Sequence, residues 1–212
     1  MVGKNSVPIK KSLKNTSLRI GFLASHNGTT MKGIISELNL KTKLKGAACV
    51  VISNNSSSPA LKFAKDAGIP AVRISETTHK SPEETDKSIR DCLTSHGVNL
   101  VILSGYMKKV GDLTLNVYPG RILNVHPALL PKHSGIWGDA VHSAVLDSKE
   151  TVTGVTIHQI DSVYDHGQIL MQTNAPVLPN DSIESLRTRV QSEEINSFIK
   201  LLTQIQQGRV II

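Results

Sequence analysis

Short apolar segments alternate with amphipathic segments along most of this 212-residue chain. One of them, Leu100–Ser104, is almost entirely apolar, which is typical of a strand that is buried on both faces. The segment before it, Pro82–His96, is expected to be a helix, and so is Pro59–Ala67, which opens with a proline at the position favoured in a first helical turn. Because strands that alternate with helices pair in parallel, this pattern predicts an α/β fold built on a doubly wound, mostly parallel, Rossmann-like sheet.

The same pattern sets the expected order of the elements. We expect about seven strands, over residues 18–25, 46–53, 71–74, 100–104, 122–126, 152–160 and 169–175. Helices are expected over residues 30–38, 59–67, 82–96, 109–117, 138–146 and 182–207. The last two strands are joined by a short loop and should form an antiparallel pair. Asp181 and Glu184 predict a capping box at the start of the long C-terminal helix.

The positive charge of the chain is concentrated at its amino terminus. The net charge is +7, but +5 of it lies in residues 1–19, which contain no acidic residue. We therefore expect a basic, disordered tail over residues 1–17 and a single domain over residues 18–212. A charge held in a tail, without aromatic residues on a strand to stack bases, argues against nucleic acid as a partner.

Segment composition and cysteine usage indicate where the protein acts. No apolar run approaches the roughly 20 residues that span a bilayer, and the first 17 residues lack the apolar core of a secretory signal. Cys49 and Cys92 lack the spacing of metal ligands and are too few for a disulfide framework. These features predict a cytoplasmic protein with reduced thiols and no membrane contact.

Polar residues follow two of the expected strands, in the region where doubly wound sheets bind ligands. Asn124 and His126 are two residues apart, so both lie on one side of the strand over 122–126. Asp165 lies in the loop that follows the strand over 152–160. An amide, an imidazole and a carboxylate placed together can stabilise an oxyanion and move a proton, which is the chemistry of acyl transfer. Taken singly, each residue is as readily an ordinary satisfied polar group.

A second candidate site lies in the turn after the first expected strand. Gly28, Thr29 and Thr30 precede or begin a helix, whose exposed N–H groups and dipole favour an anion such as a phosphate. The turn has a single glycine and no following Gly-Lys-Ser/Thr, so it predicts neither a dinucleotide site nor a Walker loop. An ordinary helix cap is the alternative. On the last helix, Arg187, Gln191 and Glu194 share a face, which by default is solvated.

Five histidines in the second half of the chain raise the alternative of a metal site. They are His126, His133, His142, His158 and His166. Their spacings include no helical pair at four residues and no accompanying thiolate, so we expect no metal.

The segments Asn124–Pro131, Gly154–His158 and Asp165–Gly167 resemble the folate-dependent formyltransferases, and the similarity extends over residues 18–207. The resemblance implies transfer of a formyl group from the co-substrate 10-formyltetrahydrofolate to the amine of glycinamide ribonucleotide, a step of purine synthesis. The implied partners are therefore small molecules, a phosphorylated amine and a folate.

The resemblance also implies roles for individual residues. The catalytic group would be Asn124, His126, Asp165 and Thr156. The ribotide would contact Gly28, Thr29, Thr30, Gln191 and Glu194. The folate would contact Met107, Lys108, Lys109, Val110, Asn124, Asp161 and Asp165.

Some positions depart from the usual family pattern, mainly on the substrate side. They are His26, Thr30, Pro82, His166 and the stretch 132–138. These departures leave open a formyltransferase that acts on another amine, such as an amino sugar nucleotide. A folate-binding module without catalysis is a further alternative, and it would not need Asp165.

Overall fold

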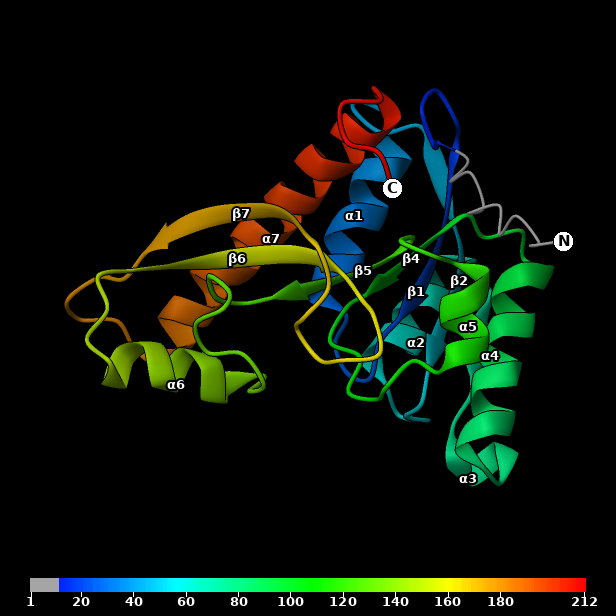
Figure 1. Cartoon of the computed structure of the whole chain (residues 1–212), viewed down its shortest axis with the longest axis horizontal. Coiled ribbons are helices and arrows are strands. Elements are labelled where there is room, and N and C mark those ends of the chain that lie inside the picture. The colour runs from blue at the N-terminus through cyan, green and yellow to red at the C-terminus, as the bar shows by residue number, and fades with distance from the viewer. Residues whose placement is uncertain (1–11) are drawn as a thin grey trace, which may run out of the picture.

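The computed structural model describes residues 12–212, and at its centre is one seven-stranded sheet (Figure 1). The strands are β1 (Leu18–Leu23), β2 (Gly46–Ser53), β3 (Ala71–Arg73), β4 (Leu100–Leu103), β5 (Ile122–His126), β6 (Val152–Gln159) and β7 (Ile169–Pro176). The helices are α1 (Thr29–Leu40), α2 (Pro59–Asp66), α3 (Glu76–His79), α4 (Pro82–Ser95), α5 (Asp112–Val117), α6 (Asp139–Asp147) and α7 (Ile183–Gln206). The α/β architecture and the seven strands expected from the sequence are confirmed, and α3 is an additional short helix.

The strand order is β3-β2-β1-β4-β5-β6-β7. The chain builds outward from β1 to β3 and then returns to place β4 on the other side of β1, with parallel pairing from β3 through to β5. The order therefore switches between β1 and β4. Ligands bind such sheets beyond the carboxyl ends of the strands at the switch point, so this edge is where a site is expected.

Each of the last three strands, β5, β6 and β7, runs antiparallel to the next. β7 runs antiparallel to β6, as the short connecting loop predicted, and β6 also runs antiparallel to β5. In the second pairing Asn124 lies opposite His158, and His126 lies opposite Thr156. The pairing thus places polar side chains of two strands next to each other on one face of the sheet.

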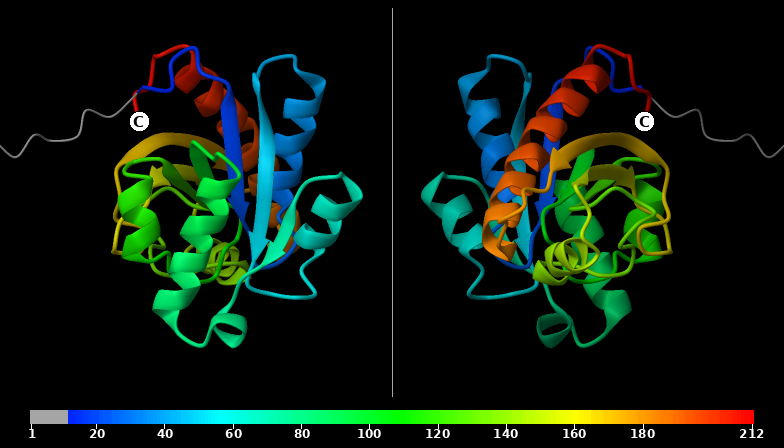
Figure 2. Two further views of the ribbon diagram at one scale, coloured as in Figure 1. Left: turned by 90° about the vertical axis from the view of Figure 1, so that its right-hand side faces the viewer. Right: turned by 90° about the vertical axis from the view of Figure 1, so that its left-hand side faces the viewer.

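Helices cover both faces of the parallel part of the sheet, as Figure 2 shows for α1 and α7 on one side and α4 on the other. Side chains alternate between these two layers along each strand. Ile102 and Leu123 pack into the core beneath α1, α2 and α7, whereas Val101 and Ile122 pack into the core beneath α4. Burial on both faces explains why these strands are continuously apolar.

The packed part of the chain begins before the expected boundary at residue 18. Residues 1–11 of the expected tail lie outside the described residues. Leu13, by contrast, is buried in the main core, and the Asn15 N–H donates a hydrogen bond to the Gln206 carbonyl at 2.9 Å. The expectation of a disordered tail is therefore wrong for residues 12–17, because an apolar side chain there closes the core at the end of α7. Between residues 12 and 212, no helix is long and apolar enough to cross a membrane.

The start of α7 also differs from the predicted capping box. Ser182, not Asp181, is the N-cap, and it exchanges hydrogen bonds with Ser185 at 3.1 and 3.0 Å. The Asp181 carboxylate instead accepts two hydrogen bonds from Arg189, at 2.6 and 2.9 Å. The Arg189 guanidinium holds the pKa of Asp181 well below its usual range. The aspartate thus pairs with a cation about two helical turns further along, which a serine could not do.

Candidate active site

A cavity of about 780 Å³ opens at the carboxyl edge of the parallel strands, at the switch point. Its walls come from the ends of β1, β4 and β5, from α1, α6 and α7, and from the loops over 135–138 and 160–165. Most of the residues expected at a site line it: Gly28, Thr29, Thr30, Met107, Lys108, Lys109, Val110, Asn124, His126, Asp161, Asp165, Gln191 and Glu194.

The amide, the imidazole and the carboxylate predicted to act together meet in this cavity. Asp165 Oδ2 lies 3.6 Å from His126 Nδ1, and Asp165 Oδ1 lies 3.6 Å from His158 Nε2. The Gly135 N–H donates a hydrogen bond to Asp165 Oδ2 at 3.0 Å. Asn124 completes the group, because its Nδ2 lies 3.3 Å from His158 Nε2.

Asp165 reaches the site by a route that the sequence pattern did not indicate. Because β6 is antiparallel to β5, its carboxyl end lies beside the start of β5 rather than beside His126. The loop after β6 therefore folds back over the sheet, and at Gly167 it passes so close to Gln159 that a Cβ would lie 1.8 Å from the Gln159 carbonyl oxygen. Asp165 itself has a φ of 54°, in the left-handed region. The carboxylate is thus placed by loop conformation, not by strand order.

His126 is 3% exposed. Burial lowers the pKa of His126, and the neighbouring Asp165 carboxylate opposes this shift. Its Nε2 is buried and has no hydrogen-bond partner among residues 12–212. A neutral imidazole with a free nitrogen beside a carboxylate can donate to a developing oxyanion or exchange a proton.

His158 is a site residue that the sequence analysis considered only as a metal ligand. The ring is buried, and its Nδ1 lies 2.9 Å from the Gln159 carbonyl oxygen, so Nδ1 carries the proton. Its Nε2 faces both the Asn124 amide, at 3.3 Å, and Asp165 Oδ1, at 3.6 Å. His158 thereby orients Asn124, and the signal for it was its position opposite Asn124 in an antiparallel pair. In the described part of the chain, no group of three or more histidines, cysteines or carboxylates could hold a metal ion.

Thr156 was expected in the catalytic group, but it does not line the cavity. Its hydroxyl donates to the Ala128 carbonyl at 2.7 Å and accepts from the Leu130 N–H at 3.0 Å and from Gln172 Nε2 at 3.0 Å. The residue lies beneath the turn that follows β5. Two of its hydrogen bonds fix that turn, and the third joins it to Gln172 of β7. Thr156 therefore positions the end of β5 and does not contact a ligand.

Replacing Thr156 by valine is expected to lower the free energy of unfolding by about 2 kcal/mol, because buried backbone and amide groups lose their partner. The measurement is urea unfolding followed by circular dichroism. Thr153→Val is the matched control, since Thr153 is a buried threonine on the same strand whose hydroxyl takes no part in this network. An equal loss of stability in both variants would contradict the role given to the Thr156 hydroxyl.

The turn predicted to hold a phosphate forms the N-terminus of α1 at one end of the cavity. Gly28 is the N-cap residue with a φ of 59°, a conformation that glycine adopts without strain. The first N–H groups of a helix lack partners within the helix, and that of Met31 donates to the Ser104 hydroxyl at 3.1 Å. The Thr30 hydroxyl donates to Glu194 Oε2 at 2.5 Å, which joins this turn to α7.

Glu194 is buried in the same wall. Its burial raises the pKa of Glu194 to about 7, and the hydrogen bond from Thr30 opposes the rise. α1 and α7 approach closely here, because a Cβ at Gly33 would lie 2.6 Å from the Ile195 side chain. Only a glycine at position 33 lets α7 bring Gln191 and Glu194 up to the turn at Thr30.

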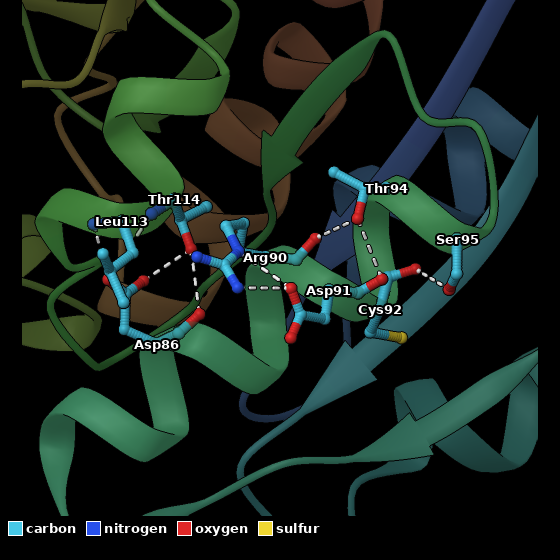
Figure 3. A network of polar contacts seen from close by, with 8 residues as sticks. All are labelled: Asp86, Arg90, Asp91, Cys92, Thr94, Ser95, Leu113 and Thr114. Carbon is cyan, nitrogen blue, oxygen red and sulfur yellow. Dashed lines mark hydrogen bonds and ion pairs between the residues drawn. The ribbon is translucent and has the colours of Figure 1, made fainter.

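The segment expected to line a folate pocket forms the opposite wall. The Met107 N–H donates to the Ser25 hydroxyl at 2.8 Å, and the start of α5 is fixed by Asp86 of α4, which accepts from the Leu113 N–H at 2.8 Å (Figure 3). Lys108 and Lys109 also line an adjoining cleft of about 550 Å³. A rigid α4–α5 contact thus holds the Met107–Val110 segment at the cavity.

The positions that depart from the family pattern lie in different places. His26 is exposed at the rim of the cavity, whereas Pro82 is the first residue of α4 and lines only the adjoining cleft. His166 Nδ1 lies 2.9 Å from Asp161 Oδ2, and this contact holds the pKa of Asp161 below its usual range. Trp137, within the departing stretch 132–138, is 66% exposed and lines the cavity.

Comparisons with known proteins agree with this geometry. The family model described as formyl transferase matches residues 18–202. The phosphoribosylglycinamide formyltransferase of Haemophilus influenzae is 31% identical over 192 residues, which cover 91% of this chain and 89% of that protein. The structure of glycinamide ribonucleotide transformylase 1 from Symbiobacterium toebii has a TM-score of 0.86 and 33% identity, and the match covers 92% of this chain and 91% of that one.

One relative is much longer than this chain. The trifunctional purine biosynthetic protein adenosine-3 of Chironomus tentans is 30% identical over 203 residues, and the chain spans only 15% of its length. The match to the family model, however, covers residues 18–202 and includes every strand of the sheet. The chain therefore belongs to the formyl transferase family.

Proposed function

We propose that this chain transfers the formyl group of 10-formyltetrahydrofolate to the amine of glycinamide ribonucleotide, as a step of purine synthesis. The observation that carries the proposal is the meeting of Asn124, His126 and Asp165 in one cavity of about 780 Å³. The names of the relatives of similar length support the same reaction. We further propose that it acts on these small molecules in the cytoplasm.

The two substrates are assigned to opposite walls of the cavity. The ribotide phosphate lies at the N-terminus of α1, beside Gly28, Thr29 and Thr30, where the N–H groups of the first turn and the helix dipole favour an anion. Gln191 and Glu194 of α7 line the same cavity, and Glu194 accepts a hydrogen bond from Thr30 of this turn. The folate lies against the Met107–Val110 segment, under the loop that carries Asp161 and Asp165.

The reaction proceeds by attack of the ribotide amine on the formyl carbon. The carbonyl π electrons move onto oxygen, and N–H donors of Asn124 and His126 stabilise the oxyanion. The attacking nitrogen loses a proton, with Asp165 as the carboxylate that assists its transfer, and N10 of the folate gains one. The C–N10 bond then breaks as the carbonyl re-forms, which releases tetrahydrofolate and the formylated amine.

The proposal is tested by incubating the chain with 10-formyltetrahydrofolate and a panel of acceptors, and by following the release of tetrahydrofolate. The panel contains glycinamide ribonucleotide, an amino sugar nucleotide and water alone. Turnover with the ribotide is the expected result. Preference for the amino sugar nucleotide, or release of formate with water alone, would show that glycinamide ribonucleotide is not the acceptor.

Folate binding is measured separately from turnover. Trp137 is the single tryptophan of the chain and lines the cavity, so ligand binding there should change its fluorescence. A chain that binds tetrahydrofolate but transfers no formyl group to any acceptor would be a binding module, and the proposal would be wrong.

A further inference from the structure

A second buried imidazole lies in the cavity wall, and no role has been given to it so far. His142 of α6 is 3% exposed and lines the cavity. Its Nδ1 is enclosed and has no hydrogen-bond partner among residues 12–212. Buried polar side chains in folded proteins almost always have a partner, so an unpartnered nitrogen in a cavity wall indicates a ligand group.

The surroundings of His142 show which substrate it faces. Asp139 precedes it by one helical turn on α6, and Arg187 of α7 binds both Asp139 oxygens, at 2.7 and 2.9 Å. Arg187 is followed on the same face of α7 by Gln191 and Glu194. His142 therefore belongs to the wall formed by α6 and α7, which the proposed function assigns to the ribotide.

The protonation state of His142 suits a neutral partner. Burial lowers the pKa of His142, Asp139 opposes the shift, and the positive charge of Arg187 adds to it. His126 contributes in the same direction, which places the two rings near each other. A neutral imidazole has one donor and one acceptor nitrogen, which matches a hydroxyl or an amide.

We propose that His142 binds the acceptor substrate, through a hydrogen bond to a ribose hydroxyl or to the amide group next to the reacting amine. This inference rests on the proposed function for the identity of the acceptor. It makes His142 a specificity residue for the ribotide, with no contact to the folate on the opposite wall. A structural histidine would instead have its nitrogens bonded to the protein.

Calorimetric titration of His142→Leu with glycinamide ribonucleotide and, separately, with tetrahydrofolate tests the inference. The ribotide should bind about tenfold more weakly than to the unaltered chain, the effect of losing one neutral hydrogen bond, and tetrahydrofolate should bind equally well. The melting temperature of His142→Leu should not fall, because leucine removes an unpartnered polar group from a buried position. His142→Asn, which keeps a polar group at this position, should recover part of the ribotide affinity.

His96→Leu is the matched control, since His96 is a partly buried histidine that lies at the end of α4 and lines neither cavity. Unchanged ribotide affinity in His142→Leu would overturn the inference, and so would equal weakening of both ligands or a lower melting temperature. This experiment measures ligand affinity, whereas the proposed function is tested by the release of tetrahydrofolate, so the two can fail independently. A chain that binds both ligands without transferring the formyl group would contradict the function while the comparison of affinities still decides the role of His142.

Discussion

Replacing Asp165 by asparagine is expected to lower kcat for formyl transfer by about 10²–10⁴, the range found when a positioned acid or base is lost. The amide keeps the shape of the side chain and can still accept the hydrogen bond from the Gly135 N–H. Asparagine also tolerates the left-handed conformation that Asp165 adopts. The variant therefore separates the charge of this side chain from its structural contribution.

The measurement is steady-state kinetics with both substrates at saturation, together with the melting temperature. Asp66→Asn is the control, because Asp66 is exposed at the end of α2 and forms only a surface pair with Lys62. A kcat for Asp165→Asn within threefold of the unaltered chain would remove this carboxylate from the mechanism. His126→Ala should lower kcat by about 10²–10³, as expected for the loss of one oxyanion donor.

The second large effect concerns Glu194 and the pH dependence of stability. The pKa of this carboxyl is about 7 in the folded chain and 4.5 in the reference state, so the folded chain binds the proton more tightly than the unfolded chain. Stability from this group is fully present below pH 4.5 and is lost as the pH rises through 7. Above that range, the buried charge costs about 3 kcal/mol.

Glu194→Gln should therefore raise the free energy of unfolding by up to about 3 kcal/mol at pH 8.5 or so, and should leave it unchanged near pH 4.5. Urea unfolding across this pH range measures the difference. Glu193→Gln is the matched control, because Glu193 is the neighbouring, less buried glutamate of α7. A constant difference across the range would show that the Glu194 carboxyl does not carry the shift. The proposed function adds that Glu194→Gln should weaken ribotide binding.

The sequence predicted the positions of some site residues correctly and those of others for the wrong reason. Asn124 and His126 were placed correctly, because alternation along a strand is a local rule that needs no knowledge of neighbours. Asp165 was assigned to the same site on the expectation that the strand before it ends beside His126, whereas β6 runs antiparallel to β5 and ends beside the start of β5. The loop that folds back over β6 brings Asp165 to the site, and its closest approach needs a glycine at position 167.

Thr156 and His158 show more clearly which residue roles the sequence cannot predict. Both lie on β6 opposite the polar residues of β5, and the sequence does not distinguish their roles. The turn after β5 and Gln172 of β7 take the three hydrogen bonds of Thr156, whereas His158 remains in the cavity beside Asn124. Which of two neighbouring polar side chains contacts a ligand depends on what packs above them.

The sequence by itself determined the succession of strands and helices and the pair at Asn124 and His126, because apolar periodicity and turn residues act over a few positions. Only the tertiary structure decided that β6 runs antiparallel to β5, that the Leu13 side chain enters the core and that His142 lies unpartnered in the cavity wall. Each of these depends on contacts between segments far apart along the chain, and such contacts leave no local pattern in the sequence.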